Sequence, residues 1–171
     1  MTRQELAGSG LMAEDLETLR LLAASSGAMR IVEVSAGTED QGDSTLALCE
    51  ALRATGGRLI SIVQGDNQAA AIRVQLQEAG FERPASSVLA GDPMKRLAAL
   101  NGPVDLLFLS GKIDYAAALQ AAMPRLRPGS LVVAHRARDE KEYLDAITDN
   151  PSFETTVLDQ GSGLGISLLK S

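Results

Sequence analysis

The stretch from residue 31 to residue 63 constrains the fold more than any other part of this chain. It contains, in order, an apolar run (31–34), a loop of small residues (35–43), a helical pattern (44–54), the pair Gly56-Gly57 and a second apolar run (59–63). Strand, helix and strand in this order predict a βαβ unit with a right-handed crossover. The loop after the first strand therefore opens at the carboxyl edge of a parallel sheet, where such folds bind ligands.

The remainder of the chain continues the alternation of helices and strands. The periodicity predicts helices at 12–23, 67–79, 93–98, 116–126 and 139–148, and strands at 87–90, 104–109 and 131–134. We expect Asp43 or Ser44 to cap the helix after the first strand, and Asp66 or Asn67 to cap the next one. Arg127-Pro128-Gly129 is expected to end the helix at 116–126 before the strand at 131–134 begins.

The closing segment differs from the rest, because two apolar runs (155–158 and 164–169) flank the Gly-rich turn Gly161-Ser162-Gly163. This pattern predicts an antiparallel hairpin. Five βα units followed by such a hairpin predict an α/β, doubly wound, Rossmann-like sheet of seven strands. The expected strand order is 3-2-1-4-5-7-6, with strand 7 antiparallel.

Size and composition restrict the function. A chain of 171 residues predicts a single domain, of which residues 1–10 are expected to be a flexible end. A net charge of −6 opposes a nucleic-acid surface, which needs clustered Lys and Arg. With the single Cys49, no basic-then-apolar leader and no apolar run of membrane length, we expect a cytoplasmic protein that contacts neither nucleic acid nor membrane.

Several segments in fixed order carry a resemblance to a known family. They are Arg30-Ile-Val-Glu-Val, Ser44-Thr-Leu-Ala-Leu, residues 72–81, Gly91-Asp92-Pro93, Val104-Asp-Leu-Leu-Phe, Leu126-Arg-Pro-Gly129 and residues 157–167. This order resembles the class I S-adenosylmethionine-dependent methyltransferases, in particular the O-methyltransferase family that includes the catechol and caffeoyl-CoA enzymes. It is also similar to plant methyltransferase-like proteins of unknown function, which share a gapped first loop.

The resemblance implies a site for S-adenosylmethionine at the carboxyl edge. Its residues here would be Glu33, Gly37, Gly42, Ser44, Asp92 and Ser110. The first loop carries about three residues more than the family pattern, between Gly37 and Gly42. The acid that holds the ribose hydroxyls in the family falls on Val63, and Asp66 is the nearest acid that could replace it. We therefore expect cofactor binding to be weakened or lost.

These residues also have purely structural alternatives. An acid on the first strand contacts a cofactor amine or caps a backbone group, and both alternatives remain open for Glu33. Gly37 and Gly42 serve ligand contact or loop geometry. Asp92 serves the adenine side of the cofactor or caps the helix that begins at Pro93.

The metal site of the family is altered more strongly. Where the resemblance implies an Asp and an Asp-Asn pair as Mg²⁺ ligands, this chain has Ser110, His135 and Arg136. Asp114 is nearby but belongs to a helix. Because a hard cation needs oxygen ligands, we expect no metal and a metal-independent reaction. His135 is then the candidate base, or a histidine without a catalytic role.

Two functions remain open. The first is an S-adenosylmethionine-dependent methyltransferase that needs no metal and acts on a small molecule. The second is a non-catalytic scaffold or regulatory protein that keeps the fold and binds a nucleotide-like ligand or a protein partner. The family's segments that cover the acceptor have no counterpart before the helix at 12–23, so we expect the acceptor side to be open or covered by a partner, such as a second copy.

Overall fold

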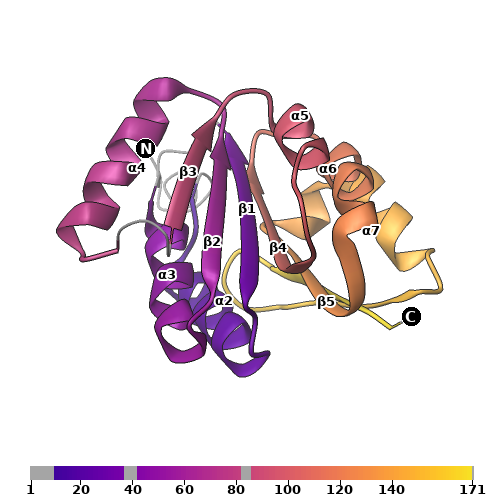
Figure 1. Cartoon of the computed structure of the whole chain (residues 1–171). Helices are drawn as coiled ribbons and strands as arrows, with labels where there is room; N and C mark the ends of the chain where they lie inside the picture. Colours follow the sequence, from indigo (N-terminus) through magenta and orange to yellow (C-terminus); the bar gives the residue numbers. More distant parts are fainter. Residues whose placement is uncertain (1–9, 37–41, 82–85, 171) are drawn as a thin grey trace, which may run out of the picture.

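The structure, a computed structural model, describes residues 10–36, 42–81 and 86–170. A seven-stranded sheet lies between two layers of helices (Figure 1). The strands are β1 (Arg30–Ala36), β2 (Arg58–Val63), β3 (Ser86–Ala90), β4 (Val104–Gly111), β5 (Leu126–Ala134), β6 (Phe153–Val157) and β7 (Gly165–Leu169). The helices are α2 (Ala13–Ser25), α3 (Asp43–Thr55), α4 (Asp66–Glu78), α5 (Pro93–Ala98), α6 (Tyr115–Ala122) and α7 (Lys141–Thr148).

The sheet has the strand order β3-β2-β1-β4-β5-β7-β6. β1 to β5 pair in parallel with one another, whereas β7 is antiparallel to both β5 and β6. The predicted fold class, strand order and antiparallel strand are therefore confirmed. β1 pairs with both β2 and β4, so the chain reverses its direction of winding at β1, and folds of this kind bind ligands at the carboxyl edge of the sheet at this point.

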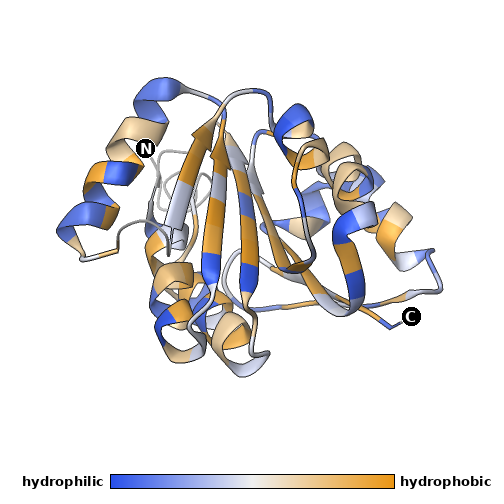
Figure 2. Cartoon of the chain, viewed as in Figure 1, coloured by the Kyte–Doolittle hydropathy of each residue, from blue (hydrophilic) through white to orange (hydrophobic). Residues whose placement is uncertain are grey.

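Successive residues of the central strands serve opposite layers. Ile31 packs in a core with α2, α3 and α4, whereas Val32 packs in a second core with α5, α6 and α7. β4 alternates in the same way, with Phe108 in the first core and Leu107 in the second. Burial on both faces requires strands that are apolar almost throughout, and Figure 2 shows such hydrophobic central strands between helices with polar outer faces.

The preceding helix ends before Arg127-Pro128-Gly129, as predicted, but the strand begins at Leu126 rather than at Leu131, so these three residues lie inside β5. The preceding helix ends at Ala122, and a 3₁₀ turn at Met123–Arg125 leads directly into the strand. The pairing of β4 with β5 shifts register between Val104 and Leu106. Ser130 bridges this irregularity, because its hydroxyl accepts from the Arg127 N–H (3.0 Å) and donates to the Val104 carbonyl (2.7 Å).

Two predicted helix caps are wrong and one is confirmed. The N-cap of α3 is Gly42 rather than Asp43 or Ser44, and the N-cap of α4 is Gly65 rather than Asp66 or Asn67. Asp92 caps α5 as predicted. In the described part of the chain, no helix combines the length and the apolar character needed to cross a membrane.

Candidate functional site

The tips of β1, β4 and β5 are tied together at the carboxyl edge of the sheet. Ser35 of β1 is the register partner of Ser110 of β4 and of Val63 of β2. The Lys112 N–H donates to the Ala36 carbonyl (2.7 Å), and the His135 N–H donates to the Leu109 carbonyl (2.9 Å). The residues predicted from the first, fourth and fifth loops are thus brought to one edge.

Glu33 is the most completely satisfied polar group at this edge. Its side chain is 1% exposed and accepts hydrogen bonds from three hydroxyl groups. Ser44 donates to Oε2, while Thr45 (2.5 Å) and Ser61 (2.8 Å) both donate to Oε1. The carboxylate therefore joins β1 to β2 and to the first turn of α3.

In the structure, the partners of Glu33 are three side-chain hydroxyl groups and not a backbone group. Thr45 and Ser61 were not predicted from the sequence. A visible signal was the polar Ser61 inside the apolar run of β2, directly opposite Glu33 in the register.

The first turn of α3 begins at Gly42, which has a left-handed backbone (φ 102°) and makes no side-chain cap. A Cβ added at Gly42 would overlap the carboxamide of Gln75 from α4, so this position is closed to side chains both by conformation and by space. The N–H groups of this turn have no side-chain cap and lie at the carboxyl edge, next to the tip of β1. Gly37 lies outside the described residues.

The position at which the family has a ribose-holding acid is occupied here by a side chain that cannot hold a ligand. Val63 is fully buried in the core shared with α3 and α4, and its carbonyl accepts a hydrogen bond from the Gly91 N–H (3.0 Å). Asp66 is exposed in the first turn of α4, just beyond the tip of β2. Asp92, at the tip of β3, accepts from the Met94 N–H (3.0 Å) as a helix cap.

The tips of β4 and β5 place few oxygen atoms together. Ser110 and His135 are 3% and 4% exposed, and Asp114 caps α6 by accepting from the Ala117 N–H. Arg136 has a left-handed backbone (φ 53°) and forms an ion pair with Asp139 (2.9 Å). Within the described residues, no group of three or more His, Cys, Asp or Glu side chains could hold a metal ion.

Beside these tips, the starts of α6 and α7 form a cluster that was not predicted. The rings of Tyr115 and Tyr143 meet edge to face, with centroids 5.9 Å apart. Burial raises the pKa of both tyrosines well above the ordinary value. Partial burial, and then the charges of Asp139 and Asp114, raise the pKa of Glu140. The two tyrosines are therefore uncharged at neutral pH, and the acidic groups Glu140, Asp139 and Asp114 lie near them.

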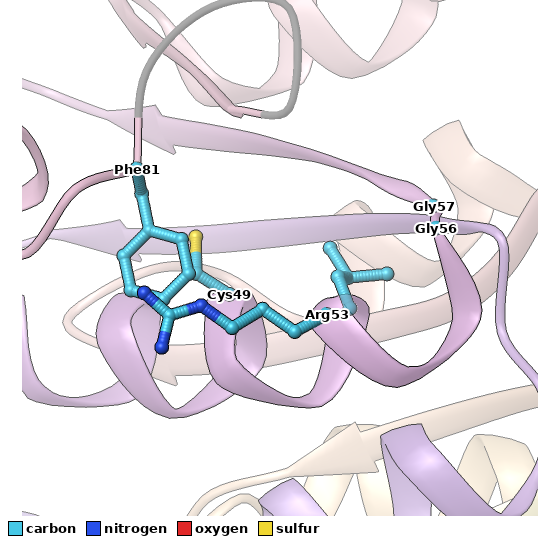
Figure 3. A pocket seen from close by; sticks show the side chains of 6 residues that line it. Cys49, Arg53, Gly56, Gly57 and Phe81 are labelled. Carbon is cyan, nitrogen blue, oxygen red and sulfur yellow. The ribbon is translucent and has the colours of Figure 1, made fainter.

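A pocket of about 190 Å³ lies elsewhere, between the carboxyl-terminal half of α3 and the residue that follows α4 (Figure 3). The Arg53 guanidinium lies 4.1 Å from the centroid of the Phe81 ring. Burial, and then the charge of Glu33, raise the pKa of the Cys49 thiol to about 12. The pocket thus includes a thiol whose raised pKa keeps it protonated at neutral pH, and it includes none of the predicted site residues.

Comparisons with known proteins agree with this architecture. A family model described as a methyltransferase domain matches residues 34–136, which is more than half of the chain. A search of curated proteins found no match. Several solved structures, however, have a similar fold.

Three of these structures come from bacteria. A putative O-methyltransferase from Klebsiella pneumoniae has 21% identity and a TM-score of 0.81, covering 98% of this chain and 86% of that one. The O-methyltransferase from Bacillus cereus in complex with SAH has 19% identity and a TM-score of 0.82, covering 95% and 84%. A putative caffeoyl-CoA O-methyltransferase from Staphylococcus aureus has 14% identity and a TM-score of 0.81, covering 97% and 88%.

At these identities the structures establish the fold alone, and the match over residues 34–136 establishes the family. The matched residues extend from the middle of β1 to the tip of β5, and so include the loops at the carboxyl edge. The expected resemblance is therefore confirmed: the chain belongs to the methyltransferase-domain family, and its fold is that of the class I O-methyltransferases.

Proposed function

We propose that the protein binds S-adenosylmethionine at the carboxyl edge and transfers its methyl group to a small-molecule acceptor without a metal ion. One observation carries this proposal: the first turn of α3 presents N–H groups without a side-chain cap at the point where the chain reverses its winding. Such a helix end favours an anionic group, and the cofactor offers its methionine carboxylate.

The residues present fit the two ends of the cofactor differently. Gly42 leaves the backbone of the α3 turn accessible, which fits the methionine end. At the ribose end, Val63 offers no hydrogen-bonding group and is buried, so Asp66 is the acid that would hold the ribose hydroxyls. We therefore expect binding to be about tenfold weaker or more than with an acid at position 63, since the loss of one charge-assisted hydrogen bond costs about that much.

The metal-independent part of the proposal rests on the tips of β4 and β5. When bound, the cofactor supplies an electrophilic methyl carbon, so the protein has to orient the acceptor and take up its proton. His135 lies at the tip of β5, beside Ser110, and an imidazole can accept a proton near neutral pH. Next to it, Asp139 is paired with the Arg136 guanidinium and is thus less available to a cation, which favours a reaction without Mg²⁺.

Calorimetric titration of S-adenosylmethionine and S-adenosylhomocysteine tests the proposal directly. Both should bind, and the dissociation constants should be equal in 1 mM Mg²⁺ and in EDTA. Gly42→Ala should weaken binding, because a side chain there is strained and meets Gln75. Gly129→Ala is the matched control: Gly129 has a similar φ of +96° with nothing within 4 Å of an added Cβ, so binding should be unchanged.

The alternative is a non-catalytic protein that keeps the fold and binds a nucleotide-like ligand or a protein partner. The burial of Val63 at the ribose position favours this alternative. Failure of both cofactor forms to bind at 1 mM would overturn the enzyme proposal in its favour. Sedimentation with and without ligand then tests the associated proposal that a second copy or another protein covers the acceptor side.

A further inference from the structure

We propose that Glu33 is a positioning residue, whose buried carboxylate fixes the first turn of α3 relative to β1 and β2 and does not itself touch the ligand. The geometry of its three hydroxyl partners carries this inference. Only the ligand-binding part of the test rests on the proposed function. The remaining tests concern the protein alone.

The carboxylate of Glu33 and its three hydroxyl partners are complementary as hydrogen-bond acceptor and donors. An ionised carboxylate has two oxygens that only accept hydrogen bonds, and it can therefore take all three hydroxyl donors at once. A glutamine could not, because its NH₂ group would face a hydroxyl as a second donor. Ser61, Thr45 and Ser44 are 0%, 1% and 6% exposed, so an unsatisfied hydroxyl at any of them would be buried.

The network accounts for the hydroxyl groups in the first turn of α3. The N-cap is Gly42, which has no side chain, and Ser44 and Thr45, the second and third residues of the helix, both donate into the sheet toward Glu33. They therefore tie this turn to the sheet. In addition, the positive end of the α3 dipole faces the carboxylate, which favours the arrangement electrostatically.

The charge of Glu33 also acts one turn further along α3, at Cys49. After burial, the charge of Glu33 is the next cause of the raised pKa of Cys49, which is about 12. Cys49 is the single cysteine of the chain, so a thiol measurement reports on this position alone. A readout of charge is therefore available that does not depend on any ligand.

Thr45 and Ser61 form a matched pair for testing the inference. Both donate to the same oxygen, Oε1, but Thr45 belongs to α3 and Ser61 to β2. Thr45→Val and Ser61→Ala each remove one donor and should lower the melting temperature similarly. Thr45→Val should also weaken S-adenosylhomocysteine binding by about tenfold, whereas Ser61→Ala should leave it within about twofold. Thr45→Ser should restore the wild-type affinity.

Amide hydrogen exchange without ligand separates this inference from the proposed function. Thr45→Val should accelerate exchange in the first turn of α3, notably at the Leu46 N–H that donates to the Gly42 carbonyl (2.8 Å), and Ser61→Ala should not. If the wild type binds no cofactor, the proposed function fails, and the exchange experiment still decides whether the Glu33 network fixes the first turn of α3. Equal exchange in both variants would overturn the inference.

Glu33→Gln completes the test. Removal of the negative charge should lower the pKa of Cys49, measured by the ultraviolet absorbance of the thiolate with Cys49→Ala as the blank, while burial keeps that pKa above the ordinary range. An unchanged pKa would overturn the assignment of the charge. If Glu33→Gln does not fold, the two single-hydroxyl variants decide alone, since each leaves the carboxylate in place.

Discussion

Asp15 Oδ1 accepts a hydrogen bond from the backbone N–H of Ser162 (3.0 Å), although the two residues are 147 positions apart in the sequence. Asp15 is 2% exposed, and its other oxygen accepts from the Met12 N–H (2.8 Å). The Ala137 N–H donates to the Gly163 carbonyl (3.1 Å). The start of α2, the turn before β7 and the tip of β5 are therefore joined at the carboxyl edge.

Gly161→Ala should destabilise the protein by breaking this junction. Gly161 has a φ of +62°, and an added Cβ would overlap Asp15 Oδ1. The carboxylate would have to move and leave the partly buried Ser162 N–H without its acceptor, so the free energy of unfolding should fall by about 2–3 kcal/mol. Urea denaturation measures it. Gly129→Ala, which has strain without overlap, should cost about 1 kcal/mol. Equal costs would show that Asp15 moves freely.

Stability should decline at alkaline pH. The folded pKa of Cys49, about 12, lies above its ordinary value of 9.0, and those of Tyr115 and Tyr143 are also raised. Above pH 9 the unfolded chain therefore releases a thiol proton that the folded chain retains. The stability associated with the neutral thiol is complete below pH 9 and is lost as pH rises toward 12. Each such group contributes about 1.4 kcal/mol per pH unit.

Urea titrations between pH 8 and pH 11 measure this slope. Cys49→Ala should reduce the decline between pH 9 and pH 10, where the tyrosines contribute least. At pH 8 the variant should be less stable than the wild type, because the substitution leaves a small cavity beside Leu52 and Phe81. A decline that is identical with and without the thiol would contradict the assignment to Cys49.

Val63→Glu should destabilise the fold strongly. Val63 is fully buried in the core with α3 and α4, and an ionised side chain there would lose its hydration without a partner. We expect a loss of about 3 kcal/mol or more. Val74→Glu is the control on α4, since Val74 is 53% exposed, and its effect should stay within about 0.5 kcal/mol. A melting temperature unchanged by Val63→Glu would mean that the side chain reaches solvent at the carboxyl edge.

The topology was predictable because local signals mark most element ends. Gly56 and Gly80, both with positive φ, end α3 and α4 where the glycine pattern placed these ends. Asp92 before Pro93 marked the start of α5, and the turn at Gly161 marked the hairpin. Signals of this kind involve neighbouring residues only, so they can be found without a structure.

Other features depend on contacts that sequence patterns do not carry. The strand character of residues 126–130 requires Ser130 to bridge a shifted register with Val104, which no local pattern reveals. The partners of Glu33 lie 12 and 28 positions away in the sequence, at Thr45 and Ser61. The candidate site was thus predicted as a set of residues at one edge, but the internal role of Glu33 was not.

Asp66→Asn tests which acid holds the ribose in the proposed site. Asp66 is exposed in the first turn of α4, where its charge favours the helix dipole, so the substitution should cost only about 0.3–1 kcal/mol of stability. If its carboxylate replaces the acid missing at Val63, S-adenosylhomocysteine binding should weaken at least about tenfold. Glu78→Gln, at the opposite end of α4, removes an acid from the negative end of the dipole. It should slightly stabilise the protein and leave binding unchanged. Unchanged binding in Asp66→Asn, with cofactor bound by the wild type, would show that the ribose is held without a carboxylate from β2 or α4.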